Sequence, residues 1–381
     1  MPSSAAETAP LQCTPLHDLH LRLGARMVSF AGHEMPLQYP AGLFKEHLHT
    51  RAAAGLFDVS HMGQIALRAD DPAEAARTLE ALMPTDVVGL APGRQRYGLL
   101  TDEAGGILDD LMVANLADRL VLVVNAARKG ADAAHLQASL PGAVSVEKLD
   151  RGLLALQGPA AGAVLTVLAP EVAEMRFMDA RELEVAGVPC LVMRSGYTGE
   201  DGFELSTPLA ATETVAEALL ADSAVLPVGL GARDSLRLEA GLCLYGADID
   251  TATSPVEAGL TFAISPARRS GGARSGGFPG AARILAEMQT GPARRRIGLL
   301  PEGRAPVRAG ALLFAGADDG VSVGRVTSGG FGPSLGAPAA MGYLPAALSE
   351  FGTRVFAEVR GQRLPATVTS LPFVAAGFKR G

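Results

Sequence analysis

The spacing of short apolar segments in the last quarter of the chain constrains its fold more than any other feature. Beyond Arg294, short apolar runs recur between turns rich in Gly and Pro. Short strands that alternate with such turns are typical of antiparallel sheets that close on themselves. We therefore expect a small antiparallel β-barrel in this region. The runs are Ile297 to Leu300, Ala311 to Phe314, Val321 to Val326 and Arg354 to Val359.

The residues before this region mix helix and strand patterns without a regular βαβ alternation. This mixture predicts an α+β class. Asp71 and Pro72 are typical of a helix start, and apolar spacing continues that helix to Met83. We also expect a strand meander over 96–101, 109–115 and 119–125, a hairpin over 188–206, and helices over 211–221 and 233–240.

A stretch rich in Arg, Gly and Ser separates the two regions. It runs from Ser265 to Gly280 and contains Arg268, Arg269 and Arg274. Such composition predicts a flexible loop or an interdomain linker. A chain of 381 residues is long enough for two or more domains. We therefore predict one domain over residues 1–280 and a C-terminal barrel domain over 281–381.

Composition excludes several classes of protein. The net charge of -7 gives no basic surplus for nucleic acid, and no apolar run approaches the roughly 20 residues that span a membrane. Residues 1–7 lack the features of a secretion signal or a mitochondrial presequence. Cys13, Cys190 and Cys243 have neither the number of a disulfide framework nor the spacing of a zinc site. We expect a cytoplasmic protein.

Familiar catalytic and metal-binding motifs are missing from the sequence. The Gly-rich residues 271–277 lack the Lys-Ser/Thr ending of a phosphate loop, and His47 and His49 lack the spacing of a zinc helix. We therefore expect no metal. His61 lies between apolar residues, which favours a hydrogen-bonded structural histidine over a catalytic base.

Two adjacent acids, Asp109 and Asp110, begin an expected strand. Alternation along a strand sends their side chains to opposite faces, so only one of them can face a given site. That carboxylate could hold a ring nitrogen of a ligand. The alternative is one acid in the turn and the other in a surface ion pair, and composition alone favours this alternative.

The expected hairpin carries a second group of polar residues at its bend. Tyr197, Glu200, Asp201 and Glu204 surround a Gly-rich turn, and a carboxylate there could accept two hydrogen bonds from an amino-pyrimidinone edge. A solvated turn is the alternative. Arg233, at the start of an expected helix, fits either an anionic ligand or a structural ion pair, and spacing leaves both open.

Together these segments resemble the glycine cleavage aminomethyltransferase family. The run from Ala232 to Gly246 is the most specific single match, and the similarity extends from Thr14 to Val374. The other matching segments are Leu56 to Met62, Gly105 to Leu111, Leu156 to Pro159, Ser195 to Glu204, Val326 to Gly329, Met341 to Tyr343 and Leu371 to Val374.

The resemblance implies both a fold and a reaction. The fold is a three-subdomain cloverleaf, with two interwoven subdomains in a folate-binding N-terminal region and a C-terminal antiparallel barrel. The reaction moves the methylene of an S-aminomethyl-dihydrolipoyl carrier protein, the H-protein, to tetrahydrofolate as acceptor substrate. Its products are 5,10-methylenetetrahydrofolate, ammonia and the dihydrolipoyl carrier.

The resemblance also assigns roles to individual residues. Asp110 matches the family's essential aspartate, which leaves Asp109 a structural role. Glu204 matches the acid that anchors the pterin edge, and Arg233 matches a ligand-binding arginine. Residues near the same site correspond to Tyr97, Asn125 and Tyr197.

The chain also departs from the family pattern. His33 stands where the family commonly has tryptophan, and the tail over 377–381 lacks the tyrosine with which some relatives touch substrate. The loop from Arg268 to Gly277 is longer than usual. These departures affect the entrance to the ligand site and the contacts with the carrier protein. We hypothesise that the loop arginines touch an acidic surface of the carrier protein.

Two other functions share this resemblance. A folate-dependent demethylase would share Asp110, although the larger oxidases of that kind carry a flavin domain, for which there is no room before Thr14. A non-catalytic folate-binding protein of iron-sulfur assembly would carry a cysteine-containing signature in its middle region. None of the three cysteines lies in such a signature, so we expect the aminomethyltransferase.

Overall fold

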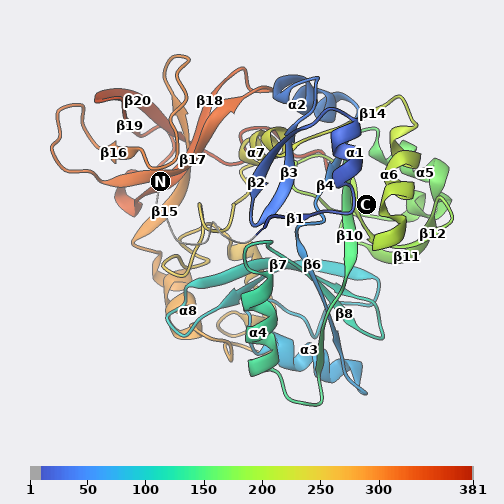
Figure 1. The fold of residues 1–381 in the computed structure, drawn as a ribbon. Helices are drawn as coiled ribbons and strands as arrows, with labels where there is room; N and C mark the ends of the chain where they lie inside the picture. Colours follow the sequence, from blue (N-terminus) through green and yellow to red (C-terminus); the bar gives the residue numbers. More distant parts are fainter. Residues whose placement is uncertain (1–9, 380–381) are drawn as a thin grey trace.

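The computed structural model describes residues 10–379 and has three lobes (Figure 1). Two lobes are built on separate sheets in the N-terminal region, and the third is a closed C-terminal barrel. This arrangement confirms the predicted α+β cloverleaf. Residues 1–7, on which the expected absence of a targeting signal rests, lie outside the described part, as do the last two residues of the tail.

The predicted meander forms a five-stranded antiparallel sheet, in the order β6-β7-β8-β5-β9. The predicted helix α3 packs against its apolar face together with α4. Asp71 caps α3 as expected, because its carboxylate accepts a 3.0 Å hydrogen bond from Ala73 N. The elements are β5 (Gly63–Arg68), α3 (Pro72–Glu80), β6 (Arg94–Thr101), β7 (Ile107–Asn115), β8 (Leu120–Val124), α4 (Lys129–Ser139) and β9 (Ser145–Lys148).

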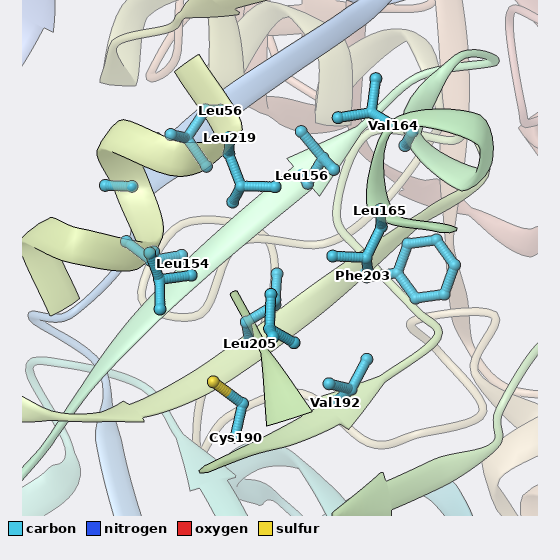
Figure 2. Close-up of a cluster of buried hydrophobic side chains, with 14 of the residues drawn as sticks. Leu56, Leu154, Leu156, Val164, Leu165, Cys190, Val192, Phe203, Leu205 and Leu219 are labelled. Carbon is cyan, nitrogen blue, oxygen red and sulfur yellow. The ribbon is translucent and has the colours of Figure 1, made fainter. Parts of the chain in front are cut away.

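A six-stranded mixed sheet, in the order β11-β12-β13-β10-β4-β14, forms the second lobe. The chain leaves this sheet after β4, builds the five-stranded sheet and returns at β10, so the two lobes are interwoven. Apolar side chains of β4, β10, β12 and β13 pack against α5 and α6 (Figure 2). The elements are β4 (Ala54–Asp58), β10 (Arg151–Gln157), α5 (Ala161–Leu168), β11 (Ala180–Val185), β12 (Val188–Met193), β13 (Gly202–Pro208), α6 (Thr212–Leu220) and β14 (Val225–Pro227).

Helix α7 (Leu230–Glu239) lies where the three lobes meet (Figure 1). It contacts α2 and β3 of the N-terminal segment and β17 of the barrel. This helix was predicted over 233–240, and it begins three residues earlier, at Leu230. The N-terminal segment consists of β1 (Gln12–Cys13), α1 (His17–Arg22), β2 (Arg26–Phe30), β3 (His33–Gln38) and α2 (Leu43–Ala52).

The C-terminal strands close into the predicted barrel, in the order β15-β18-β17-β16-β19-β20. Its interior is filled by aliphatic side chains from all six strands. The pattern of apolar residues did not predict β18 or β20, because Ala, Pro and polar residues interrupt the apolar run in each strand. The strands are β15 (Arg294–Pro301), β16 (Leu312–Phe314), β17 (Gly324–Gly332), β18 (Ala337–Pro345), β19 (Arg354–Val359) and β20 (Gln362–Thr369).

The Arg- and Gly-rich segment is held by hydrogen bonds, so the alternative of a flexible loop is wrong, whereas that of an interdomain linker stays a prediction. Arg268 Nη1 donates to Glu80 Oε1 at 3.2 Å, and Arg269 Nε donates to Ile264 O at 2.7 Å. Helix α8 (Ala281–Thr290) follows and packs on Ile264 and other apolar residues of the N-terminal region. No helix among residues 10–379 is long and apolar enough to cross a membrane.

Candidate active site

Asp110 lies on β7 and is held by residues of both neighbouring strands. Tyr97 on β6 donates a hydrogen bond from Oη to Asp110 Oδ2 at 2.9 Å. Asn125, which directly follows β8, donates from Nδ2 to Asp110 Oδ1 at 2.8 Å. The meander therefore places three of the predicted site residues in one hydrogen-bonded cluster.

Asp109 is fully buried and turns toward helix α4 instead. Asn125 donates to it twice, from Nδ2 at 2.9 Å and from the backbone N at 3.2 Å. The Asp109 carboxyl also interacts with that of Asp132, a buried residue of α4, and this interaction raises the pKa of Asp109. Only Asp110 also contacts Tyr97, but Asn125 Nδ2 contacts both carboxylates, so the two acids are not separated as the expected alternation implied. The alternative of a surface ion pair is wrong for Asp109, because this residue is fully buried.

These carboxyl groups titrate near neutral pH. Burial, followed by the charge of Asp109, raises the pKa of Asp110 to about 7, against the opposing hydrogen bonds from Tyr97 and Asn125. Burial, followed by the interaction with Asp132, raises the pKa of Asp109 to about 8. Asp110 can therefore change its protonation state at physiological pH, as a group that assists proton movement needs to do.

Glu204 lies on β13 of the other lobe, and its side chain is buried. Ser195 Oγ donates to Glu204 Oε2 at 3.1 Å. Burial raises the pKa of Glu204, while the charge of Arg233 and the hydrogen bond from Ser195 oppose that shift. The predicted alternative of a solvated turn therefore does not hold for Glu204.

Arg233 lies in the first turn of α7, with its guanidinium carbon 4.8 Å from the centroid of the Tyr197 ring. Within residues 10–379 its Nη1 is buried without a hydrogen-bond partner, and the guanidinium forms no ion pair within 4.0 Å. A buried, unpaired N–H group costs free energy unless a ligand or water satisfies it. Between the two alternatives for Arg233, this geometry favours a ligand oxygen.

The two groups of residues meet through the packing around Cys243. Tyr197 Oη donates to the carbonyl of Cys243, and Tyr97 packs against the apolar cluster that contains Cys243. Burial raises the pKa of Tyr197, and the negative charge of Asp110 adds to this shift. The structure thus brings all six predicted residues into one region where both N-terminal lobes and α7 meet.

The histidines that the sequence singled out lie in other surroundings. Burial, followed by the charge of Arg233, lowers the pKa of His61 to about 3. The His61 ring was expected to be hydrogen-bonded, but its Nδ1 is buried without a partner among the described residues. Lys129 Nζ lies 3.2 Å from Nε2 of His33. His47 contacts Ser235, Glu239 and Ser334, and His49 contacts the carbonyl of Ala224.

Sequence reasoning missed Asp132, which raises the pKa of Asp109, and Ser195, which donates a hydrogen bond to Glu204. Asp132 is buried on the inner face of α4 beside Ala133 and Leu136. An acid on the apolar face of an amphipathic helix was the one available signal. A cavity of about 330 Å³ lies elsewhere, lined by residues such as Pro72 and Arg119, and none of the six predicted site residues lines it.

Fold and site together define an α+β protein with a two-lobed N-terminal region, a C-terminal barrel and a group of buried polar residues where the lobes meet. The family model described as the GCVT N-terminal domain matches residues 16–268, and the model of the glycine cleavage T-protein C-terminal barrel domain matches residues 294–375. The chain belongs to the glycine cleavage T-protein family.

Individual relatives agree along almost the whole chain. The chain is 45% identical to the mitochondrial aminomethyltransferase of Gallus gallus over 386 residues, covering 99% of this chain and 95% of the relative. It is 43% identical to the corresponding protein of Homo sapiens, with 99% and 93% covered. The crystal structure of glycine cleavage system aminomethyltransferase T from Bartonella henselae is similar, with a TM-score of 0.90, 47% identity, and 97% and 100% covered.

Proposed function

We propose that this chain is a tetrahydrofolate-dependent aminomethyltransferase that accepts its one-carbon unit from a lipoylated carrier protein. The observation that carries the proposal is the Asp110 carboxylate, held by Tyr97 and Asn125 and facing the same region as Glu204 and Arg233. The relatives named aminomethyltransferase support the reaction.

The site offers groups of the kind that a reduced pterin requires. Glu204 can accept two hydrogen bonds from the amino and ring N–H groups of an amino-pyrimidinone edge. Such donors favour the ionised form of Glu204 and so counteract the effect of burial on its pKa. Arg233 Nη1 is a free donor for a ligand oxygen. These two residues would set the orientation of the ring system.

Asp110 would act where the carbon is transferred. The carbon–sulfur and carbon–nitrogen bonds of the aminomethyl group break, and two bonds form from the carbon to folate nitrogens. The two protons lost by those nitrogens go to the departing amine, which leaves as ammonia, and to the carrier sulfur. A carboxylate beside the folate amines stabilises the positive charge that develops there and can relay one of these protons.

The proposal is tested by the formation of ammonia and 5,10-methylenetetrahydrofolate from the aminomethylated carrier and tetrahydrofolate. Asp110→Asn keeps the shape of the side chain and removes its charge, so turnover should fall by about 100-fold or more, the usual range for a lost acid–base group. The matched control is Asp118→Asn, an exposed aspartate in the β7–β8 turn. Wild-type turnover in Asp110→Asn would contradict the role of Asp110.

The alternatives give different results in the same assay. A demethylase would turn over methylated amine donors and leave the aminomethylated carrier unused, whereas a binding protein would bind tetrahydrofolate without turnover. The relatives from Gallus gallus and Homo sapiens are mitochondrial aminomethyltransferases. We propose a cytoplasmic location for this chain on the basis of its composition, and cell fractionation would test it.

A further inference from the structure

Three side chains outside the candidate active site bring a thiol, an imidazole and a carboxylate together. Cys13, His17 and Glu34 each offer one ligand atom, and all three atoms lie within 4.8 Å of one another. Cys13 is the exposed thiol of the chain, because Cys190 and Cys243 are buried. The proposed aminomethyl transfer uses none of these three groups.

The backbone fixes this arrangement. Cys13 in β1 is the register partner of Glu34 in β3, and paired residues of neighbouring strands project their side chains from the same face of a sheet. His17 opens α1 after a turn in which its backbone N donates to Thr14 O at 3.1 Å. The three ligands therefore belong to a folded scaffold, and a sequence distance of 21 residues between Cys13 and Glu34 conceals their proximity.

The distances suit a small divalent cation. His17 Nε2 and Glu34 Oε2 are 2.9 Å apart. Zinc binds nitrogen and oxygen at about 2.0 Å, so two ligands of a tetrahedral site lie roughly 3.3 Å from each other. A bound ion can replace the hydrogen bond after a small separation of these atoms. The exposed Cys13 side chain can rotate to complete a zinc–sulfur bond of about 2.3 Å.

The surroundings favour a positive ion. Asp18 Oδ1 lies 3.4 Å from Nδ1 of His17, on the opposite side of the ring from Glu34. A carboxylate on the second ring nitrogen is the usual way to orient a zinc-binding histidine. Within the described part of the chain, neither Asp18 nor Glu34 forms an ion pair with Lys or Arg. Their negative charges are thus left to attract a cation.

We propose that Cys13, His17 and Glu34 bind a zinc-class divalent cation, with water as the fourth ligand. Thiolate and imidazole suit Zn²⁺ or Co²⁺ rather than Mg²⁺ or Ca²⁺, and binding releases the thiol proton. The ion ties the two-residue strand β1 to α1 and β3. This proposal departs from the sequence-based expectation of no metal, which considered only spacing along the chain.

Cobalt titration of the metal-free full-length protein tests the proposal. One equivalent of Co²⁺ should produce thiolate-to-cobalt charge-transfer absorption and the visible bands of a tetrahedral ion, and Zn²⁺ should displace it. Cys13→Ser should abolish the charge-transfer band. Loss of a ligand in Cys13→Ser, His17→Ala or Glu34→Gln should weaken Zn²⁺ binding by more than about 100-fold, and Asp18→Asn by about tenfold.

The matched control is Glu147→Gln, which neutralises an exposed carboxylate on β9 and should leave metal affinity unchanged. The proposal is overturned if the wild type shows no charge-transfer band, or if the band survives in Cys13→Ser. It is equally overturned if His17→Ala and Glu34→Gln bind Zn²⁺ as tightly as the wild type, because the thiol would then act alone. Circular dichroism of each variant establishes that it is folded.

Discussion

The buried carboxyl groups of Asp109 and Asp132 lie close enough to shift each other's pKa, beside Asp110. Two neighbouring buried carboxyl groups are not readily ionised together, so near neutral pH this pair holds one proton. Arg128 Nε, 4.0 Å from Asp132 Oδ1, favours the negative charge on Asp132 and the proton on Asp109. The pair therefore determines how much negative charge Asp110 experiences.

This relationship predicts the pH dependence of turnover. The pKa of Asp110 is raised to about 7, so its carboxyl is neutral below that pH and ionised above it. If the ionised form is active, kcat should rise with pH through about 7. Asp109, whose pKa is about 8, is mostly protonated where Asp110 titrates, so Asp109→Asn removes little charge and should leave the rise near pH 7. A pH profile of kcat checks this expectation.

Asp132→Asn should move the same profile to higher pH. Without the Asp132 carboxyl, Asp109 loses the interaction that raises its own pKa and ionises at neutral pH. Its charge lies nearer to Asp110, whose pKa then rises, and the profile should shift upward by on the order of one unit. An unshifted profile in Asp132→Asn would contradict the coupling. Asp118→Asn, at the surface, should leave the profile unchanged.

Tyr97→Phe should lower kcat about tenfold or more, because a hydrogen bond to a charged group contributes roughly 1.5–3 kcal/mol. The variant removes the Oη donor 2.9 Å from Asp110 and keeps the ring. Since that bond lowers the pKa of Asp110, the pH profile should also shift upward. Tyr245→Phe is the control, because its Oη contacts the carbonyl of Ile107 instead of a carboxylate. An unchanged profile in Tyr97→Phe would show that Tyr97 does not tune Asp110.

Arg233→Lys should raise the KM for tetrahydrofolate about 10-fold to 100-fold, with a smaller effect on kcat. Lysine keeps the charge but loses the planar donor fork and the stacking on Tyr197, 4.8 Å away. Arg77→Lys, on the exposed face of α3, serves as the control. An unchanged KM would show that the free Nη1 of Arg233 does not contact this substrate.

The sequence predicted the meander, the hairpin and the barrel because each carries its own turn and alternation signals. Strand β18 was not predicted, because Ala339 and Ala340 have no strand preference of their own. They are extended because β18 pairs with β15 and β17 in the closed barrel. Asp110 was singled out by resemblance, whereas Asp132 meets Asp109 only through the packing of α4 on the sheet. A tertiary contact of that kind leaves no mark in local spacing. The roles of the six site residues remain predictions.

Glu239→Gln should lower the free energy of unfolding by about 3 kcal/mol, the typical loss when one partner of a buried ion pair is removed. Burial alone would raise the pKa of Glu239, but hydrogen bonding to His47 outweighs it and lowers that pKa to about 2. The carboxylate also accepts from Arg51 and from the backbone N of Ser334, which joins α7 to α2 and the β17–β18 turn. Denaturant unfolding against the exposed control Glu182→Gln measures the loss.

The arginines of the segment 265–280 should contribute to stability rather than to carrier binding. Arg268 is buried against Glu80, Arg274 Nε donates to Glu80 at 2.6 Å, and Arg269 donates to two backbone carbonyls. Replacing Arg268 removes one of the positive charges that balance the buried Glu80 carboxylate. Arg268→Gln should therefore lower the free energy of unfolding by about 3 kcal/mol.

Arg274→Gln should cost about 1 kcal/mol, because this side chain is half-exposed and the ion pair is screened by water. Neither variant should change the KM for the carrier, because the guanidinium groups already have partners within the N-terminal lobe. Carrier titrations together with denaturant unfolding separate the two roles. A raised KM for the carrier at unchanged stability would contradict this prediction and support the hypothesis from the sequence that these arginines contact the carrier.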